Sequence, residues 1–152
     1  MTTAPATVGV IGLGNMGLPM AGHLLAAGFA VRGHDVRPEA MDALARAGGT
    51  PTASPAEAVA GAPMAITSLP SVAALQEVVG GESGLAGAGL DGLILIETST
   101  LPVAAKAEAA AALGRVGAVG PGLPAQRHGQ PDAGPRHRRL RQRGPGRAQA
   151  QP

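Results

Sequence analysis

The sequence predicts an α/β fold in which helices cover both faces of a doubly wound parallel sheet. Apolar segments of strand length alternate with helix-forming segments as far as residue 114, a pattern typical of βαβ units. The first unit carries a glycine-rich turn, G-x-G-x-x-G, between a β-branched apolar run and a segment with helical spacing. An acid, Asp35, closes the next apolar segment. Together these three observations favour a nucleotide-binding α/β domain.

The expected elements follow one another regularly. Residues 7–11 are β-branched and apolar, which predicts a buried strand, and apolar residues then recur at helical spacing until Gly28. Ser54 followed by Glu57 predicts a helix start, because these side chains can cap the first helical turn. The expected strands are 7–11, 30–35, a short one near 49–51, 63–68 and 93–97, and the expected helices are 15–27, 38–47, 55–60, 71–79 and 102–113.

The glycine turn predicts a dinucleotide site, because each glycine meets a separate physical need. Gly12 lets the chain turn sharply out of the strand, Gly14 lets the backbone approach a pyrophosphate, and Gly17 lets the new helix pack closely on the strand. Free N–H groups at the start of that helix would face the phosphates. The alternative for the same residues is a strand, a turn and a helix without a ligand.

Asp35 lies where the second strand is expected to end. A carboxylate there can accept hydrogen bonds from both ribose hydroxyls of NAD, and it would repel a 2′-phosphate. NAD is therefore favoured over NADP. The neighbouring Arg37 keeps NADP open as the alternative, because an arginine can receive that phosphate. The other interpretation of Asp35 is a solvated acid at a strand end.

Length and composition limit the class of protein. A chain of 152 residues suits one domain, and its single aromatic residue, Phe29, leaves the core to Ala, Val, Leu and Ile. The absence of cysteine excludes disulfides, thiolate metal sites and a cysteine nucleophile. The first residues lack the positive region of a signal peptide, and no apolar run reaches the length of a membrane span. We therefore expect a cytoplasmic protein with no membrane partner and an unknown oligomeric state.

The sequence changes character near residue 120. Residues 1–120 carry five basic side chains against nine acids, a net charge of −4, whereas residues 121–152 carry seven arginines against one acid, a net charge of +6. The second segment has few apolar residues to offset its chain entropy. We expect a dinucleotide-binding domain over 1–118 and a disordered Pro/Gly/Arg-rich tail over 119–152. Arginines without interleaved aromatic residues favour only non-specific phosphate binding, so no specific nucleic-acid partner is expected.

Four segments, in order along the chain, closely resemble the β-hydroxyacid dehydrogenase family. They are Gly12-Leu13-Gly14-Asn15-Met16-Gly17-Leu18-Pro19-Met20-Ala21, His34-Asp35-Val36, Ile66-Thr67-Ser68-Leu69-Pro70-Ser71, and Glu97-Thr98-Ser99-Thr100 with Pro102 after it. This family contains 3-hydroxyisobutyrate dehydrogenase, tartronate semialdehyde reductase and the cofactor domain of 6-phosphogluconate dehydrogenase. The resemblance covers about residues 7–114. It implies a Rossmann-type domain from an oxidoreductase that transfers hydride between a nicotinamide cofactor and a short 3-hydroxy acid.

The glycine turn, the end of the second strand and the resemblance together select the candidate cofactor-binding residues. The resemblance implies that the Leu-Pro loop contacts the cofactor and that the Ser-Thr segment lies beside the nicotinamide. The candidates are Gly12, Leu13, Gly14, Asn15, Met16, Gly17, Asp35, Val36, Arg37, Leu69, Pro70 and Thr100.

The chain departs from the family after residue 114. The family continues with an Asp-x-Pro-x-Ser-Gly-like substrate loop and an all-helical domain that carries a catalytic lysine, and this chain matches neither. Its only lysine, Lys106, lies in an alanine-rich segment and matches no catalytic position. We therefore assign no catalytic residue and no metal ligand, and we expect a truncated cofactor domain without activity of its own. The alternative is a stand-alone nucleotide-binding module without catalysis.

A change of reading frame would explain the tail. Residues 121–129, back-translated and shifted by one nucleotide, can spell Leu-Asp-Cys-Pro-x-Ser-Gly-Thr, which resembles the missing substrate loop. Codon degeneracy makes this shifted reading compatible with the sequence, and only the DNA can decide it. The tail is thus expected to be a frameshifted segment that was never selected to fold.

Overall fold

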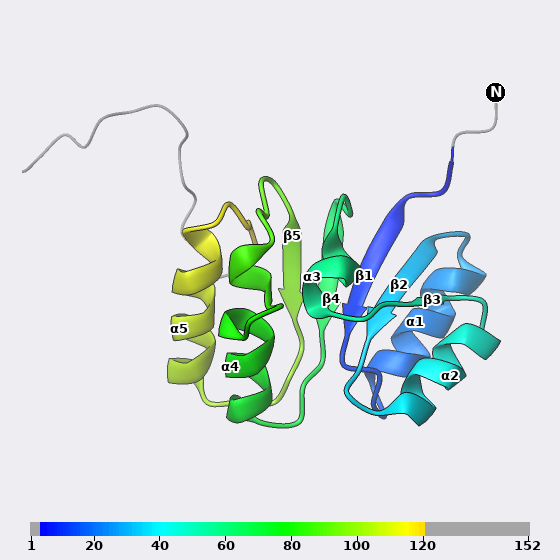
Figure 1. The fold of residues 1–152 in the computed structure, drawn as a ribbon, viewed down its shortest axis with the longest axis horizontal. Coiled ribbons are helices and arrows are strands. Elements are labelled where there is room, and N and C mark those ends of the chain that lie inside the picture. Colours follow the sequence, from blue (N-terminus) through cyan, green and yellow to red (C-terminus); the bar gives the residue numbers. More distant parts are fainter. Residues whose placement is uncertain (1–3, 121–152) are drawn as a thin grey trace, which may run out of the picture.

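The computed structural model describes residues 4–120, and it confirms the expected α/β fold. Five parallel strands form a sheet in the order β3–β2–β1–β4–β5 (Figure 1). The strands are β1 (Thr7–Ile11), β2 (Ala30–His34), β3 (Thr50–Pro51), β4 (Met64–Thr67) and β5 (Ile94–Glu97). The helices are α1 (Gly17–Ala26), α2 (Pro38–Arg46), α3 (Pro55–Val59), α4 (Val72–Gly80) and α5 (Val103–Gly114), with a 3-10 turn, η1, at Leu85–Gly87.

Strand β1 occupies the centre of the sheet and sets the register of its neighbours. Ile11, the last residue of β1, is paired with His34 of β2 on one side and with Thr67 of β4 on the other. The three chain segments that follow these strands therefore leave the sheet at the same edge. From β1 the next two strands, β2 and β3, lie on one side, and the following strands, β4 and β5, lie on the other. In open α/β sheets, ligands bind at the point where the strand order changes direction in this way.

Helices cover both faces of the sheet, as expected for parallel strands. Successive β1 side chains point to opposite faces, so Val10 and Ile11 belong to different apolar clusters. Figure 1 shows α1 and α2 packed together beside β2, and α4 and α5 packed together beside β5. The Val10 cluster also contains Leu13, Ala21, Val31, Ala40 and Leu44, and the Ile11 cluster includes Ala58, Leu75, Leu85, Leu95 and Leu113.

Two helices, α3 and α4, begin at serine side-chain caps. The Ser54 hydroxyl accepts a hydrogen bond from the Glu57 N–H at 3.2 Å, and the Glu57 carboxylate accepts one from the Ala53 N–H at 3.0 Å, which confirms the expected cap. The Ser71 hydroxyl caps α4 by accepting a hydrogen bond from the Ala74 N–H at 3.1 Å. The first helix begins at Gly17 rather than at residue 15, because the two residues before it belong to the turn.

Backbone pairing with β5 extends to Val119, although the alternation of predicted strands and helices in the sequence ends after Gly114. The Val119 N–H donates to the Leu93 carbonyl at 2.8 Å, and the Val119 carbonyl accepts from the Leu95 N–H at 2.9 Å. Val119 thus pairs with the sheet one residue beyond the expected domain boundary. The rest of the expected disordered tail, residues 121–152, and the expected frame change lie outside the described residues. Over residues 4–120, no helix is both long enough and apolar enough to cross a membrane.

Candidate cofactor site

A cavity of about 870 Å³ lies at the edge where β1, β2 and β4 end. Its volume falls within the range of small-molecule and cofactor sites, which is roughly 300–1,000 Å³. Its walls come from the glycine turn, the ends of β2 and β4, the loop before α3, and one side of α4 with the loop after it. The candidate residues that line it are Gly12, Gly14, Asn15, Met16, Asp35, Val36, Arg37, Leu69 and Pro70.

Two of the three motif glycines are required by the fold itself. Gly12 adopts a positive φ of 87°, and a Cβ atom there would overlap the Ser68 carbonyl oxygen. A Cβ atom at Gly17 would overlap the carbonyl oxygen of Gly12, so the start of α1 touches the turn directly. Any side chain at either position would force backbone atoms apart.

Gly14 differs from the other two glycines. A Cβ atom there would meet only the Arg37 side chain, at 3.8 Å, and Gly14 does not have a positive φ. The protein's own packing therefore leaves room for a side chain at this position. The open space lies in the cavity, beside N–H groups of Gly14, Asn15 and Met16 that make no hydrogen bond within residues 4–120.

Leu13 takes part in the site through its backbone rather than its side chain. The side chain is only 2% exposed and packs in the core below the sheet edge. Its N–H donates a 2.7 Å hydrogen bond to Asp35 Oδ2. The glycine turn and the end of β2 are thereby joined at the floor of the cavity.

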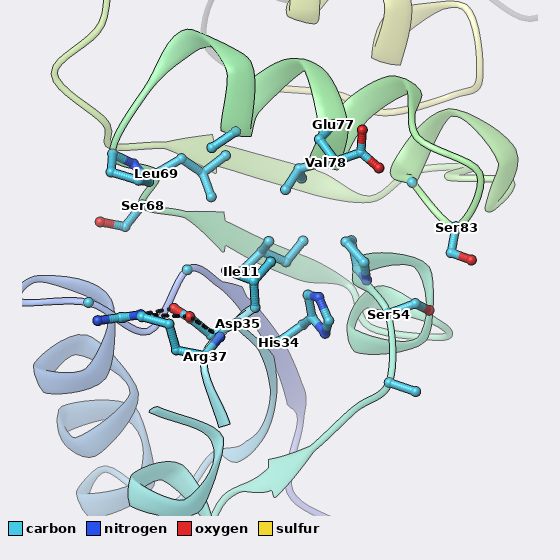
Figure 2. Close-up of a pocket in the computed structure, with 18 of the residues that line it drawn as sticks. Ile11, His34, Asp35, Arg37, Ser54, Ser68, Leu69, Glu77, Val78 and Ser83 are labelled. Carbon is cyan, nitrogen blue, oxygen red and sulfur yellow. Dashed lines mark hydrogen bonds and ion pairs between the residues drawn. The ribbon is translucent and has the colours of Figure 1, made fainter. Parts of the chain in front are cut away.

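The Asp35 carboxylate is surrounded by donors (Figure 2). Oδ1 accepts from the Arg37 N–H at 2.9 Å and from Arg37 Nε at 3.0 Å, while Oδ2 accepts from Leu13 and from Arg37 Nη2 at 3.1 Å. Partial burial by itself raises the Asp35 pKa, but the hydrogen bonds from Arg37 and Leu13 and the Arg37 charge outweigh it. The pKa is therefore held below its ordinary value of 3.8, and the carboxylate is charged at neutral pH.

The far end of the cavity contains residues that the sequence did not single out as candidates for cofactor binding. Figure 2 shows Glu77 and Val78 of α4 facing the cavity, with Ser54 and Ser83 at the end opposite Arg37. The Ala56 N–H donates a hydrogen bond to the Ser83 carbonyl at 3.3 Å, which joins the start of α3 to the loop after α4. Ser54 could have been found, because it follows β3 at the carboxyl edge. Glu77 and Val78 carry no local signal, since only helix packing brings them here.

The segments after β4 and β5 are also joined. The Leu69 N–H donates to Ser99 Oγ at 2.8 Å, and the Ser99 side chain is only 5% exposed. Thr100, the candidate residue next to Ser99, is exposed and does not line the cavity. Within residues 4–120, no three His, Asp or Glu side chains are placed to hold a metal ion together.

The comparisons with known proteins agree with this geometry. Residues 7–124 match the family described as the NAD binding domain of 6-phosphogluconate dehydrogenase. The chain is 41% identical over 95 residues to L-threonate dehydrogenase of Cupriavidus necator, a match that covers 62% of this chain and 32% of that protein. It is 38% identical over 112 residues to mitochondrial 3-hydroxyisobutyrate dehydrogenase of Mus musculus, covering 74% of this chain and 33% of that protein.

A solved structure supports the same assignment. The fold is similar to that of 3-hydroxyisobutyrate dehydrogenase from Mycobacterium tuberculosis, with a TM-score of 0.69 and 33% identity, over 76% of this chain and 39% of that chain. The chain therefore spans about a third of the length of the curated relatives it matches. With residues 7–124 matched, this chain belongs to the family of the NAD binding domain of 6-phosphogluconate dehydrogenase.

Proposed function

We propose that this chain binds a nicotinamide dinucleotide in the cavity at the carboxyl edge of its sheet. The observation that carries the proposal is Gly14, whose missing side chain leaves open space in the cavity rather than making room for another part of the protein. The N–H groups beside that space and the N-terminus of α1 supply partial positive charge for a pyrophosphate. A cavity of about 870 Å³ is large enough to hold much of such a ligand.

We also propose that NAD is preferred over NADP. The Asp35 carboxylate is charged, and it can exchange its bonds from Arg37 for bonds from the two hydroxyls of a ribose, while it keeps the one from Leu13. A 2′-phosphate at the same place would meet that negative charge. NADP would require the Arg37 guanidinium to leave Asp35 and bind the phosphate, which 56% exposure of the Arg37 side chain permits.

The proposed oxidoreductase activity belongs to a longer protein than this chain. The cofactor, when bound, would accept or donate a hydride, and the reaction also needs a held substrate, a short 3-hydroxy acid, with a proton donor in reach. Lys106 does not fill this role, because its ammonium is paired with Glu97 at 2.9 Å and lies outside the cofactor cavity. We therefore propose a cofactor domain that is inactive by itself. A cytoplasmic location stays a prediction.

Titration calorimetry with NAD and with NADP tests the proposal. The wild-type chain is expected to bind NAD at least about tenfold more tightly, since one charge-assisted hydrogen bond contributes roughly 1.5–3 kcal/mol. Asp35→Ala should remove this preference, whereas the matched control Arg37→Ala should keep NAD binding and weaken NADP binding. Equal affinities in the wild type, unchanged by Asp35→Ala, would refute the role of Asp35.

A further inference from the structure

A chain of polar contacts runs from α5 to the cofactor cavity. Lys106 of α5 pairs with Glu97 Oε2 at 2.9 Å, and Glu97 Oε1 accepts a hydrogen bond from the Ser99 N–H at 2.7 Å. Ser99 Oγ in turn accepts the 2.8 Å hydrogen bond from the Leu69 N–H. Leu69 lines the cofactor cavity, whereas Glu97 and Lys106 line a separate cavity of about 300 Å³.

We propose that Ser99 is a positioning residue for the cofactor, and that it acts by holding the loop of Leu69 and Pro70 against the cavity. This proposal rests on the proposed cofactor binding. The side chain of Ser99 is 5% exposed and is directed at the Leu69 backbone, so Ser99 does not contact a ligand in the cavity. Its buried hydroxyl is the only hydrogen-bond partner that the Leu69 N–H has within residues 4–120.

The loop needs such a partner because the β-ladder ends just before it. The Ser68 N–H still donates to the Ile11 carbonyl at 2.9 Å, which is the last backbone bond between this segment and β1. The next N–H, that of Leu69, has no strand beside it and would lie partly buried without a partner, which proteins avoid. Ser99 supplies the acceptor and thereby fixes where the loop leaves the sheet.

Glu97 and Lys106 lie further from the cavity and hold Ser99 in place. Glu97 Oε1 holds the backbone of Ser99 in a tight turn, and the Lys106 ammonium holds the other oxygen of that carboxylate. The ammonium would therefore serve to orient Glu97 rather than to transfer a proton. This assignment gives the only lysine of the chain a function within the cofactor domain.

The test compares Ser99→Ala with a neighbouring control. Thr98→Val also removes one hydroxyl hydrogen bond between the ends of β5 and β4, namely the 2.8 Å bond to the Thr67 carbonyl, but that bond does not reach the Leu69 loop. NADH fluorescence gives the affinities. Amide hydrogen exchange at Leu69 reports the loop itself.

Ser99→Ala is expected to weaken NADH binding roughly three- to tenfold, as for the loss of one hydrogen bond, and to speed exchange at the Leu69 amide. Thr98→Val should stay within about twofold of wild type in both measurements. Ser99→Thr keeps a hydroxyl group and should retain most of the NADH affinity. Lys106→Met should weaken NADH binding less than Ser99→Ala does. Equal effects of Ser99→Ala and Thr98→Val, or no effect of Ser99→Ala, would overturn the proposal. If the wild type does not bind NADH, the proposed function is refuted. Even then, an unchanged exchange rate at the Leu69 amide in Ser99→Ala would refute the positioning role of Ser99.

Discussion

Substituting alanine at Gly14 and at Gly17 separates the needs of the ligand from the needs of the fold. A methyl group at Gly14 would lie 3.8 Å from the nearest atom outside its own neighbours, at a position without positive φ. Gly14→Ala should therefore change the free energy of unfolding by no more than about 1 kcal/mol. The same methyl group occupies the space where a pyrophosphate would approach the backbone. The loss of one charge-assisted hydrogen bond, worth roughly 1.5–3 kcal/mol, weakens binding about tenfold to a hundredfold.

Gly17→Ala should have the opposite pattern. Its methyl group would overlap the Gly12 carbonyl oxygen, so either the turn or the whole of α1 must move. Overpacking of this kind costs roughly 1–3 kcal/mol or more, and each kcal/mol lowers the melting temperature of a domain this size by about 4 °C.

Thermal melts measure the stability of both variants, and NADH titrations measure their affinity for the cofactor. The expected outcome is a stable Gly14→Ala protein that binds NADH much more weakly than wild type and a Gly17→Ala protein that melts at a clearly lower temperature. Full NADH affinity in Gly14→Ala would refute the placement of the pyrophosphate. A large fall in its melting temperature would show that the fold itself needs Gly14.

Three further predictions concern other parts of the chain. Because the folded-state pKa of Asp35 is lowered, the Asp35 carboxylate stabilises the fold above the ordinary pKa of 3.8, and this stabilisation is lost as the pH falls through the folded-state pKa. Acid should therefore destabilise the wild type more steeply than Asp35→Asn. Urea melts over a range of pH measure this, and identical pH profiles for the two proteins would contradict it. Ser71→Ala removes the cap of α4 and should cost about 1 kcal/mol of unfolding free energy, and an unchanged denaturation midpoint would argue against the cap. The frame-change hypothesis, which concerns residues outside the described part, predicts that the corrected DNA encodes the substrate loop of the family; resequencing the locus tests it, and an early stop in the shifted frame would sink it.

Most of the fold could be predicted because its signals are local. The glycine turn, the cap at Ser54 and the short apolar strands each depend on residues close together in the chain. The contact between Gly17 and the Gly12 carbonyl likewise explains why the G-x-G-x-x-G spacing is informative.

The parts of the site that the sequence did not reveal depend on packing between distant segments. Glu77 of α4 and Ser83 of the loop after it line the cavity together with residues of the glycine turn, which lies far from both in the sequence. The bond between Leu69 and Ser99 joins residues 30 apart, so no local pattern could predict that Ser99 faces the loop. The hydrogen bond from the Leu13 N–H to Asp35 could not be predicted either, because Leu13 follows a different strand, 22 residues before Asp35.

Cofactor binding at the glycine turn can be tested directly by an NMR titration of the labelled 152-residue chain with NAD, read at the backbone amides. We expect the largest shifts at Gly12, Gly14, Asn15 and Met16, with further shifts at Asp35 and Leu69, which line the cavity. Residues of the separate cavity between α4 and α5, such as Ala109 and Leu113, should shift little. An unchanged spectrum at saturating NAD, or shifts concentrated at that second cavity, would contradict the proposal that this domain binds the cofactor at its glycine turn.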